Sequence, residues 1–98
     1  MIRHVVMFRW NEGVEAAHVA ATTAAFAELP GQIPQIRSYA FGADLGVAQT
    51  NFDYAVTGEF DSVDTFIEYR DHPAHQALVQ HYIVPHVSQR VAVQFTVS

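Results

Sequence analysis

The segment that decides the fold lies at the start of the chain, Ile2–Trp10, and reads IRHVVMFRW. β-Branched and aromatic residues dominate it, as in a β-strand. Alternation with a period of two gives one face with His4, Val6, Phe8 and Trp10 and an opposite face with Val5 and Met7. Because the strand is apolar at its centre on both faces, we expect it to be covered on both sides.

The rest of the chain divides into segments with strand and helix patterns. We expect helices at Val14–Leu29, ended by Pro30 and Gly31, at Val63–His72, after an Asp61-Ser62 cap, and at Ala74–Ile83, with Pro73 at its first position. We expect strands at Ile33–Gly42, Phe52–Phe60 and Arg90–Val97, with a loop at Ala43–Asn51. The order β-α-β-β-α-β predicts an α+β, ferredoxin-like fold, in which a four-stranded antiparallel sheet carries its helices on one face.

The composition indicates that the other face of this sheet is covered as well. Half of the 98 residues are hydrophobic and only 15% are charged, against about 25% in an average globular protein. A single domain spanning residues 1–98 has too small a core to bury them all. We therefore expect a homodimer, in which two sheets pack face to face and Val5 and Met7 enter a shared barrel-like interior.

The charge balance and two missing residue types exclude several classes of function. The net charge is −5 and the five arginines are scattered, which argues against nucleic-acid binding. The chain contains no cysteine and no lysine, so thiolate nucleophiles, disulfides and Schiff bases are excluded. No segment has the roughly 18–20 apolar residues of a membrane helix or the apolar core of a signal peptide. We expect a cytoplasmic protein without a membrane partner.

The densest group of polar side chains is Tyr69–His75, which reads YRDHPAH. Tyr69 precedes a predicted helix break and His75 lies in the first turn after it, so the two side chains can meet at one opening. Histidine titrates near neutral pH and a tyrosine hydroxyl can hold an oxyanion, so the pair suits acid–base chemistry. The alternative is structural, with His72 and His75 capping the kink between the helices.

The other histidines allow several interpretations. His4 is either a hydrogen-bonded core histidine or a ligand-binding group, which Tyr54 on the third predicted strand could join. A metal site from His4, His75 and His86 is conceivable, but no spacing motif supports it, and we expect neither a metal nor an organic cofactor. We expect His18 at the surface.

Several segments of the chain resemble the stress-responsive dimeric α/β-barrel (Dabb) domain family. They are the opening Ile2–Phe8, the strand–helix junction Phe60–Val63, the Tyr69–His75 block and the ending Ile83–Pro85 with its following strand. The likeness covers essentially the whole chain, and its most specific part is the His-Pro-x-His motif. It implies a ferredoxin-like fold paired into a barrel homodimer, in agreement with the residue pattern.

Within this family the chain is similar to polyketide cyclases of the olivetolic acid cyclase type, which close a linear polyketide thioester by aldol condensation without a cofactor. The resemblance implies that Tyr69 and His75 are catalytic. It also implies a pocket between helices and sheet, with the substrate-binding residues His4, Val6, Phe8, Phe26 and Leu78, to which we add Tyr54 and His72 as neighbours. The chain departs from the cyclases at Tyr54 and His86, which replace a histidine and a tryptophan, and in a shorter loop after Gly42.

The leading hypothesis is a small cofactor-independent enzyme that acts on a polyketide-like or other carbonyl compound. In it, His75 removes a proton next to a carbonyl, Tyr69 holds the oxyanion, and His4 orients the substrate. Two alternatives are a non-catalytic stress-responsive barrel that binds a hydrophobic ligand and a cofactor-free monooxygenase, which rests on fold analogy. An enzyme should have a cavity of about 300 Å³ or more, with Tyr69 and His75 at its wall.

Overall fold

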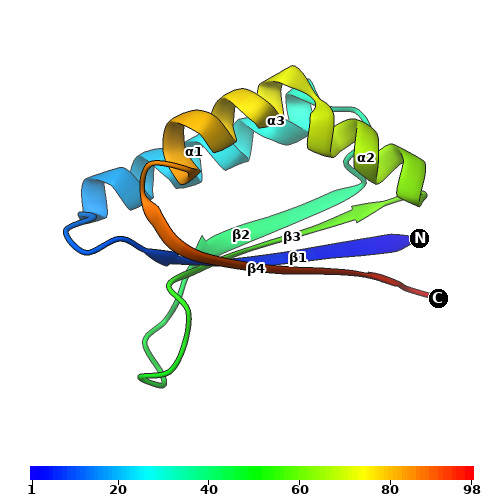
Figure 1. Ribbon diagram of the computed structural model, residues 1–98. Helices are drawn as coiled ribbons and strands as arrows, with labels where there is room; N and C mark the ends of the chain where they lie inside the picture. The colour runs from blue at the N-terminus through cyan, green and yellow to red at the C-terminus, as the bar shows by residue number, and fades with distance from the viewer.

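The computed structural model describes all 98 residues, and its four strands form one antiparallel sheet in the order β2-β3-β1-β4. The elements are β1 (Ile2–Trp10), α1 (Ala16–Gln32), β2 (Ser38–Ala43), β3 (Tyr54–Phe60), α2 (Val63–Asp71), α3 (Pro73–Leu78), a π-helical turn η1 (Val79–Ile83) and β4 (Val87–Thr96). All helices lie on one face of the sheet (Figure 1). The predicted ferredoxin-like arrangement is confirmed, with the second helical region divided into three pieces.

The first helix continues past the proline that the pattern places at its end. α1 contains Pro30 and ends at Gln32. A proline inside a helix removes one hydrogen bond, the one to the carbonyl four residues earlier, and here it stands close to the helix end. The next bond is intact, because the Ile33 amide donates to the Leu29 carbonyl at 2.8 Å. The predicted helix end at Leu29 is therefore wrong, because the helix continues for about one more turn, to Gln32.

The second and fourth strands do not begin where the pattern predicts. Ile33 is fully buried and its carbonyl accepts a hydrogen bond from the Ile36 amide at 3.2 Å, so the chain turns there. Pairing with β3 begins when the Arg37 amide donates to the Glu59 carbonyl at 2.9 Å. β4 begins earlier than predicted, at Val87. These shifts move strand ends but leave the strand order and the faces unchanged.

Strand β1 lies at the centre of the sheet, between β3 and β4. His4, Val6 and Phe8 are buried beneath the helices, whereas Met7 is 38% exposed on the opposite face. The alternation predicted from Ile2–Trp10 is confirmed. The face under the helices is called the inner face below, and the other is called the outer face.

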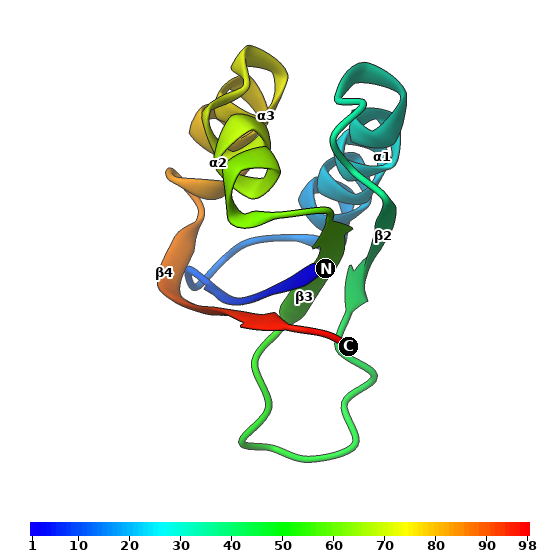
Figure 2. The same ribbon diagram turned by 90° about the vertical axis from the view of Figure 1, so that its right-hand side faces the viewer.

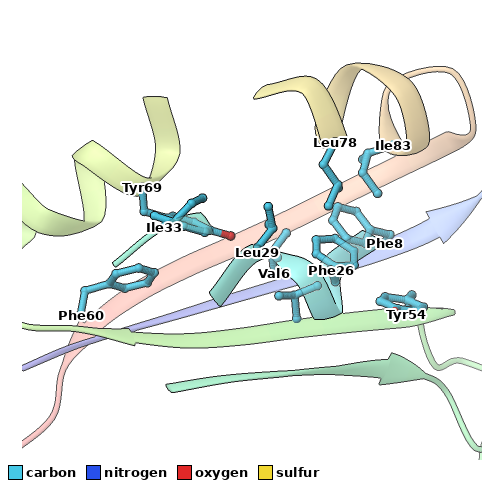
Figure 3. Packing of buried hydrophobic residues seen from close by; sticks show 11 residues of the cluster. Val6, Phe8, Phe26, Leu29, Ile33, Tyr54, Phe60, Tyr69, Leu78 and Ile83 are labelled. Atoms are coloured by element: carbon cyan, nitrogen blue, oxygen red, sulfur yellow. The ribbon is translucent and has the colours of Figure 1, made fainter. Parts of the chain in front are cut away.

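The core fills the space between the inner face and the helices (Figure 3). It takes residues from every element except the two edge strands, β2 and β4. The eleven residues are Val6, Phe8, Phe26, Leu29, Ile33, Tyr54, Val56, Phe60, Tyr69, Leu78 and Ile83. Aromatic rings dominate it. Phe26 of α1 stacks on Tyr54 with ring centroids 5.9 Å apart, and Phe60 lies 4.8 Å from Tyr69. Burial of this apolar surface is the main force that holds the helices on the sheet.

The outer face carries an apolar strip without cover. In the register of β1 and β4, Val5 lies opposite Val93 and Met7 opposite Val91. Val93 and Phe95 are 54% and 45% exposed. The loop between β2 and β3 projects from this side of the sheet, away from the helices (Figure 2). The helices themselves are too short or too polar to span a bilayer.

Candidate functional site

The site is built around the break between α2 and α3. Ser62 caps α2 by accepting a hydrogen bond from the Thr65 amide at 3.2 Å. The helix ends at Asp71, and the His72 ring caps α3, because its Nδ1 accepts from the Ala74 amide at 3.0 Å. Pro73 follows at the first helical position, where its missing N–H costs nothing. This turn of the chain brings the rings of Tyr69 and His75 together.

Tyr69 extends from α2 over the inner face (Figure 3) and is 2% exposed. Its ring centroid lies 4.4 Å from that of His75. Its hydroxyl shares a hydrogen bond of 2.6 Å with the hydroxyl of Tyr39 on β2. Burial raises the pKa of Tyr69 to about 12, although the bond from Tyr39 and the charge of Arg90 act in the opposite direction. Tyr69 is therefore protonated at neutral pH.

Tyr39 belongs to the site although it is not among the predicted site residues. It lies opposite Gly58 in the β2–β3 register. A Cβ atom at position 58 would stand 3.1 Å from the Tyr39 ring, so the absent side chain makes room for that ring. Strand alternation alone places Tyr39 and Phe41 on one face of the sheet. The signal in the sequence that could have identified Tyr39 is Gly58, because a glycine in the opposite strand leaves space for a large side chain.

His75 has one ring nitrogen engaged and the other free to accept a proton. Its Nδ1 lies 2.9 Å from the Arg70 carbonyl, and because a carbonyl only accepts, Nδ1 carries the hydrogen. In the neutral ring, Nε2 then holds the lone pair. Burial lowers the pKa of His75 below its usual 6.5; the bond to Arg70 raises it in part, and the charge of Arg90 lowers it again. His75 is therefore mostly neutral at pH 7.

His4 lies behind this pair, at 4% exposure, with its ring centroid 6.2 Å from that of Tyr69. The Gln94 amide donates to its Nδ1 at 2.9 Å, which places the hydrogen of the neutral ring on Nε2. Burial, together with the charges of Arg90 and His75, lowers its pKa to about 4. Gln94, which is not among the predicted site residues, lies opposite His4 in the β1–β4 register.

A cavity of about 420 Å³ lies between the inner face and the second helical region. It is lined by Val6, Phe8, Phe26, Val56, Tyr69, Arg70, His75, Gln76, Val79, Ile83, Val84, Val87 and Arg90. Nine of these thirteen residues are hydrophobic. The volume suits a small organic molecule, and the polar groups gather on the side of α2, α3 and β4.

Five of the predicted site residues line this cavity and four do not. Tyr69, His75, Val6, Phe8 and Phe26 line it. Of the other four, His72 caps α3, His4 is bonded to Gln94, Leu78 is buried in the core, and the Tyr54 hydroxyl shares a hydrogen bond of 2.8 Å with Thr23.

A second hollow, of about 560 Å³, lies beneath the β2–β3 loop, where Met7, Phe52 and Ala55 are among its lining residues. Its ionisable lining groups are Asp44 and Tyr54. The Asp44 carboxylate accepts hydrogen bonds from Gly46 and Asn51 of the same loop, so it shapes the loop. The hollow on the inner side, which holds Tyr69 and His75 together, is therefore the candidate site.

The remaining histidines form no metal centre. No group of three histidine, aspartate or glutamate side chains is arranged to hold a metal ion. His18 is half-buried rather than at the surface, contrary to expectation, because its ring stacks on His86 at 3.7 Å. Its Nε2 donates to the Tyr82 carbonyl at 3.0 Å. These contacts join the start of α1 to η1 and to the chain that follows it.

Solved structures from several organisms share this fold. A dimeric ferredoxin-like protein of unknown function from Thermobifida fusca is 46% identical, with a TM-score of 0.91 over 98% of this chain and 90% of that one. The hydroxynitrile lyase of Passiflora edulis has a TM-score of 0.85 at 20% identity, over 99% of this chain and 93% of its own. At that identity the second likeness shows the fold alone.

Sequence comparisons point in the same direction. An uncharacterised protein of Streptomyces coelicolor is 37% identical over 79 residues, which are 79% of this chain and 81% of that protein. The model of the Dabb family, described as a stress responsive A/B barrel domain, matches residues 2–97. With nearly the whole chain matched, the protein belongs to the Dabb family of stress-responsive A/B barrel domains.

Proposed function

We propose that this Dabb protein is an acid–base catalyst that removes a proton from the carbon next to a carbonyl group, as a polyketide cyclase-like enzyme does. The observation that carries the proposal is the pairing of Tyr69 and His75, 4.4 Å apart by ring centroids, on the wall of the apolar cavity. A base and an oxyanion donor side by side are what such a step requires. The hydroxynitrile lyase supports the proposal only as a catalyst built on the same fold.

His75 is the proposed general base. Its lowered pKa keeps the ring neutral at pH 7, and the bond from Nδ1 to the Arg70 carbonyl leaves Nε2 as the accepting atom. Gln76 donates to the same carbonyl at 2.8 Å, so the backbone that orients the ring is itself held. A base positioned in this way contributes roughly 100- to 10,000-fold to a rate.

Tyr69 is the proposed oxyanion donor, and Tyr39 positions it. The raised pKa of Tyr69 keeps its hydroxyl protonated, so it donates to the carbonyl oxygen as negative charge develops there. When Tyr39 donates to the Tyr69 oxygen across their 2.6 Å bond, the proton of Tyr69 is free for the substrate. His4, bonded to Gln94, supports the ring of Tyr69 from behind.

The outer face is the proposed homodimer interface. Met7, Val91, Val93 and Phe95 are exposed there and, with the half-buried Val5, form an apolar strip. Such a strip is typical of a surface that a partner covers, and the similar protein of Thermobifida fusca is dimeric. Two sheets facing each other would enclose this strip as a barrel interior, and the candidate site of each protomer would lie outside the barrel.

A hydrogen-exchange assay tests the catalytic proposal without knowledge of the natural substrate. The probe is the hexanoyl thioester of N-acetylcysteamine in D₂O, whose protons next to the thioester carbonyl exchange slowly on their own. NMR should show faster exchange with the wild-type protein, a rate close to the buffer rate with His75→Ala, and a rate lowered about tenfold or more with Tyr69→Phe. The control is His81→Ala, since His81 is exposed and outside the cavity.

Two results of this assay would decide against the proposal. If His75→Ala exchanges the probe as fast as the wild type, His75 is not the base. If the wild type binds the probe, by changes in its NMR spectrum, but does not speed up exchange, the protein is a hydrophobic-ligand-binding barrel instead.

A further inference from the structure

Arg90 lies at the wall of the candidate site. It is opposite Phe8 in the register of β1 and β4, and because Phe8 is buried on the inner face, Arg90 shares that face. Its side chain lines the cavity together with Tyr69 and His75. Arg90 itself is exposed, so its guanidinium group stands where the cavity meets the solvent.

Arg90 is the arginine for which the protein supplies no partner. Three of the others form ion pairs, Arg3 with Glu59 at 3.0 Å, Arg37 with Asp61 at 2.9 Å and Arg70 with Asp71 at 2.9 Å. Arg9 lies over the ring of Phe52, 4.4 Å from its centroid. Arg90 has neither kind of contact.

The cavity lining as a whole is positive, in a protein whose net charge is −5. It contains two arginines, Arg70 and Arg90, and no aspartate or glutamate. Ten carboxylates are available elsewhere in the chain, so their absence from this wall leaves the charge of Arg90 unopposed. An arginine planted at the mouth of an otherwise apolar cavity is suited to bind an anion, since its planar group matches a carboxylate in two parallel hydrogen bonds.

The charge of Arg90 reaches the reactive side chains. Burial is the main cause of the pKa changes of His4, Tyr69 and His75, and in all three the positive charge of Arg90 contributes by lowering the pKa. A bound anion would cancel that contribution. His75 would then become a stronger base when the ligand is in place than in the empty protein.

We propose that the ligand of this cavity is an organic carboxylate with an apolar body, its carboxylate bound by Arg90 and its body in contact with Val6, Phe8 and the other apolar walls. This inference rests on the proposed function only for the reacting group, a carbonyl beside Tyr69 and His75. It narrows the substrate from any carbonyl compound to a keto acid or a carboxylate-bearing thioester. A neutral ligand would leave Arg90 without a partner.

Calorimetric titration with two matched probes tests the proposal. Hexanoate and hexanamide have the same chain and differ in charge. Wild-type protein should bind hexanoate about tenfold or more tightly than hexanamide, and Arg90→Gln should remove this preference. The control, Arg37→Gln, removes an arginine that is paired with Asp61 outside the cavity and should keep the preference.

Three outcomes would overturn the proposal: equal binding of the two probes, a preference that survives Arg90→Gln, and no binding of either probe up to about 10 mM. Because Arg90 is exposed, its replacement should leave the thermal unfolding midpoint unchanged, which separates lost binding from lost folding.

The same titration with His75→Ala separates this proposal from the catalytic one. If His75→Ala loses proton exchange but keeps the preference for hexanoate, and Arg90→Gln removes that preference, both proposals hold. If exchange depends on His75 but hexanamide binds as well as hexanoate, only the carboxylate inference fails. If hexanoate binding depends on Arg90 but exchange does not depend on His75, only the catalytic proposal fails.

Discussion

The two faces of one sheet differ in how they treat polar groups. On the inner face, His4 and Tyr54 are nearly fully buried, as is Tyr69 of α2 above them, and each has a hydrogen-bond partner at 2.6–2.9 Å. On the outer face, Val93 and Phe95 are about half exposed and present no polar group at all. Successive side chains of a strand point to opposite faces, so along β1 a residue of the inner face is followed by one of the outer face.

This difference separates two tasks. A buried polar group is costly unless it is paired, so the paired groups of the inner face hold side chains at defined positions. Apolar contacts have little directional preference, so an apolar strip is suited to pack against the surface of another protein molecule. The proposed chemistry therefore lies on the inner face and the proposed assembly on the outer one. The predictions that follow test this separation, beginning with the largest effect.

A charge placed on the outer face should break assembly. Val5→Asp would bury a carboxylate among Met7, Val91 and Val93 in the proposed dimer, which costs about 4 kcal/mol, or roughly a thousandfold in dimer affinity. Analytical ultracentrifugation should then report the monomer mass. The matched control is Val47→Asp, since Val47 is 86% exposed in the β2–β3 loop. A Val5→Asp protein that remains a dimer would show that the outer face is not the interface.

Acid should lower the free energy of unfolding through the buried His4 of the inner face. The native pKa of His4 is about 4 against 6.5 in a free side chain, so the unfolded chain binds a proton that the folded one rejects. Stability from this source is complete above about pH 6.5 and falls as the pH drops towards about 4, by about 3 kcal/mol in all. His75 acts in the same direction.

Urea unfolding over this pH range measures the effect. His4→Gln should flatten the profile, because the titrating ring is gone, whereas His81→Gln, at an exposed position, should leave it unchanged. A profile that is equally steep in His4→Gln and in the wild type would contradict the assignment to His4.

Loss of the Tyr39 hydroxyl should slow the proposed reaction without disturbing assembly. Tyr39→Phe removes the partner of Tyr69 at 2.6 Å, so the Tyr69 hydroxyl is no longer held, and the exchange rate should fall about tenfold, or about 1.4 kcal/mol. Probe affinity should stay constant, since Tyr39 does not line the cavity. An unchanged rate would mean that Tyr69 needs no positioning partner.

The smallest effect is expected from a polar contact of the inner face outside the site. Thr23→Val removes the 2.8 Å hydrogen bond to the buried Tyr54 hydroxyl and should lower the free energy of unfolding by about 1 kcal/mol. Exchange of the thioester probe should be unaffected. A large loss of exchange would show that the site extends to this end of the inner face.

Much of the fold follows from local pattern. The alternation in Ile2–Trp10, the Asp61-Ser62 cap and Pro73 at a helix start act within a few residues, and the structure confirms the elements they predict. The errors arise where non-local contacts decide. The start of β2 depends on the bond from Arg37 to Glu59, which a linear pattern does not contain.

The site is less predictable for the same reason. Tyr69 and His75 lie six positions apart, so their proximity follows from one helix break. Tyr39 and Gln94 reach the site from other strands, and their roles depend on the register with Gly58 and His4. Arg90 is visible in the sequence only as one of five arginines, and its missing partner becomes evident when the ion pairs of the others are known.

Because of the π-helical turn Val79–Ile83, the shape of the cavity depends on the number of residues in this segment. A π turn accommodates one residue more than an α-helix would in the same space. Val79 and Ile83 line the cavity from this turn, and Val84 lines it directly after the turn. Deletion of one residue there would restore an α-helix. It would also rotate the residues on one side of the deletion by about 100° relative to those on the other side. The wall of the site is therefore more sensitive to a single deletion than to most substitutions, and relatives that differ in length here are expected to differ in the ligands they accept.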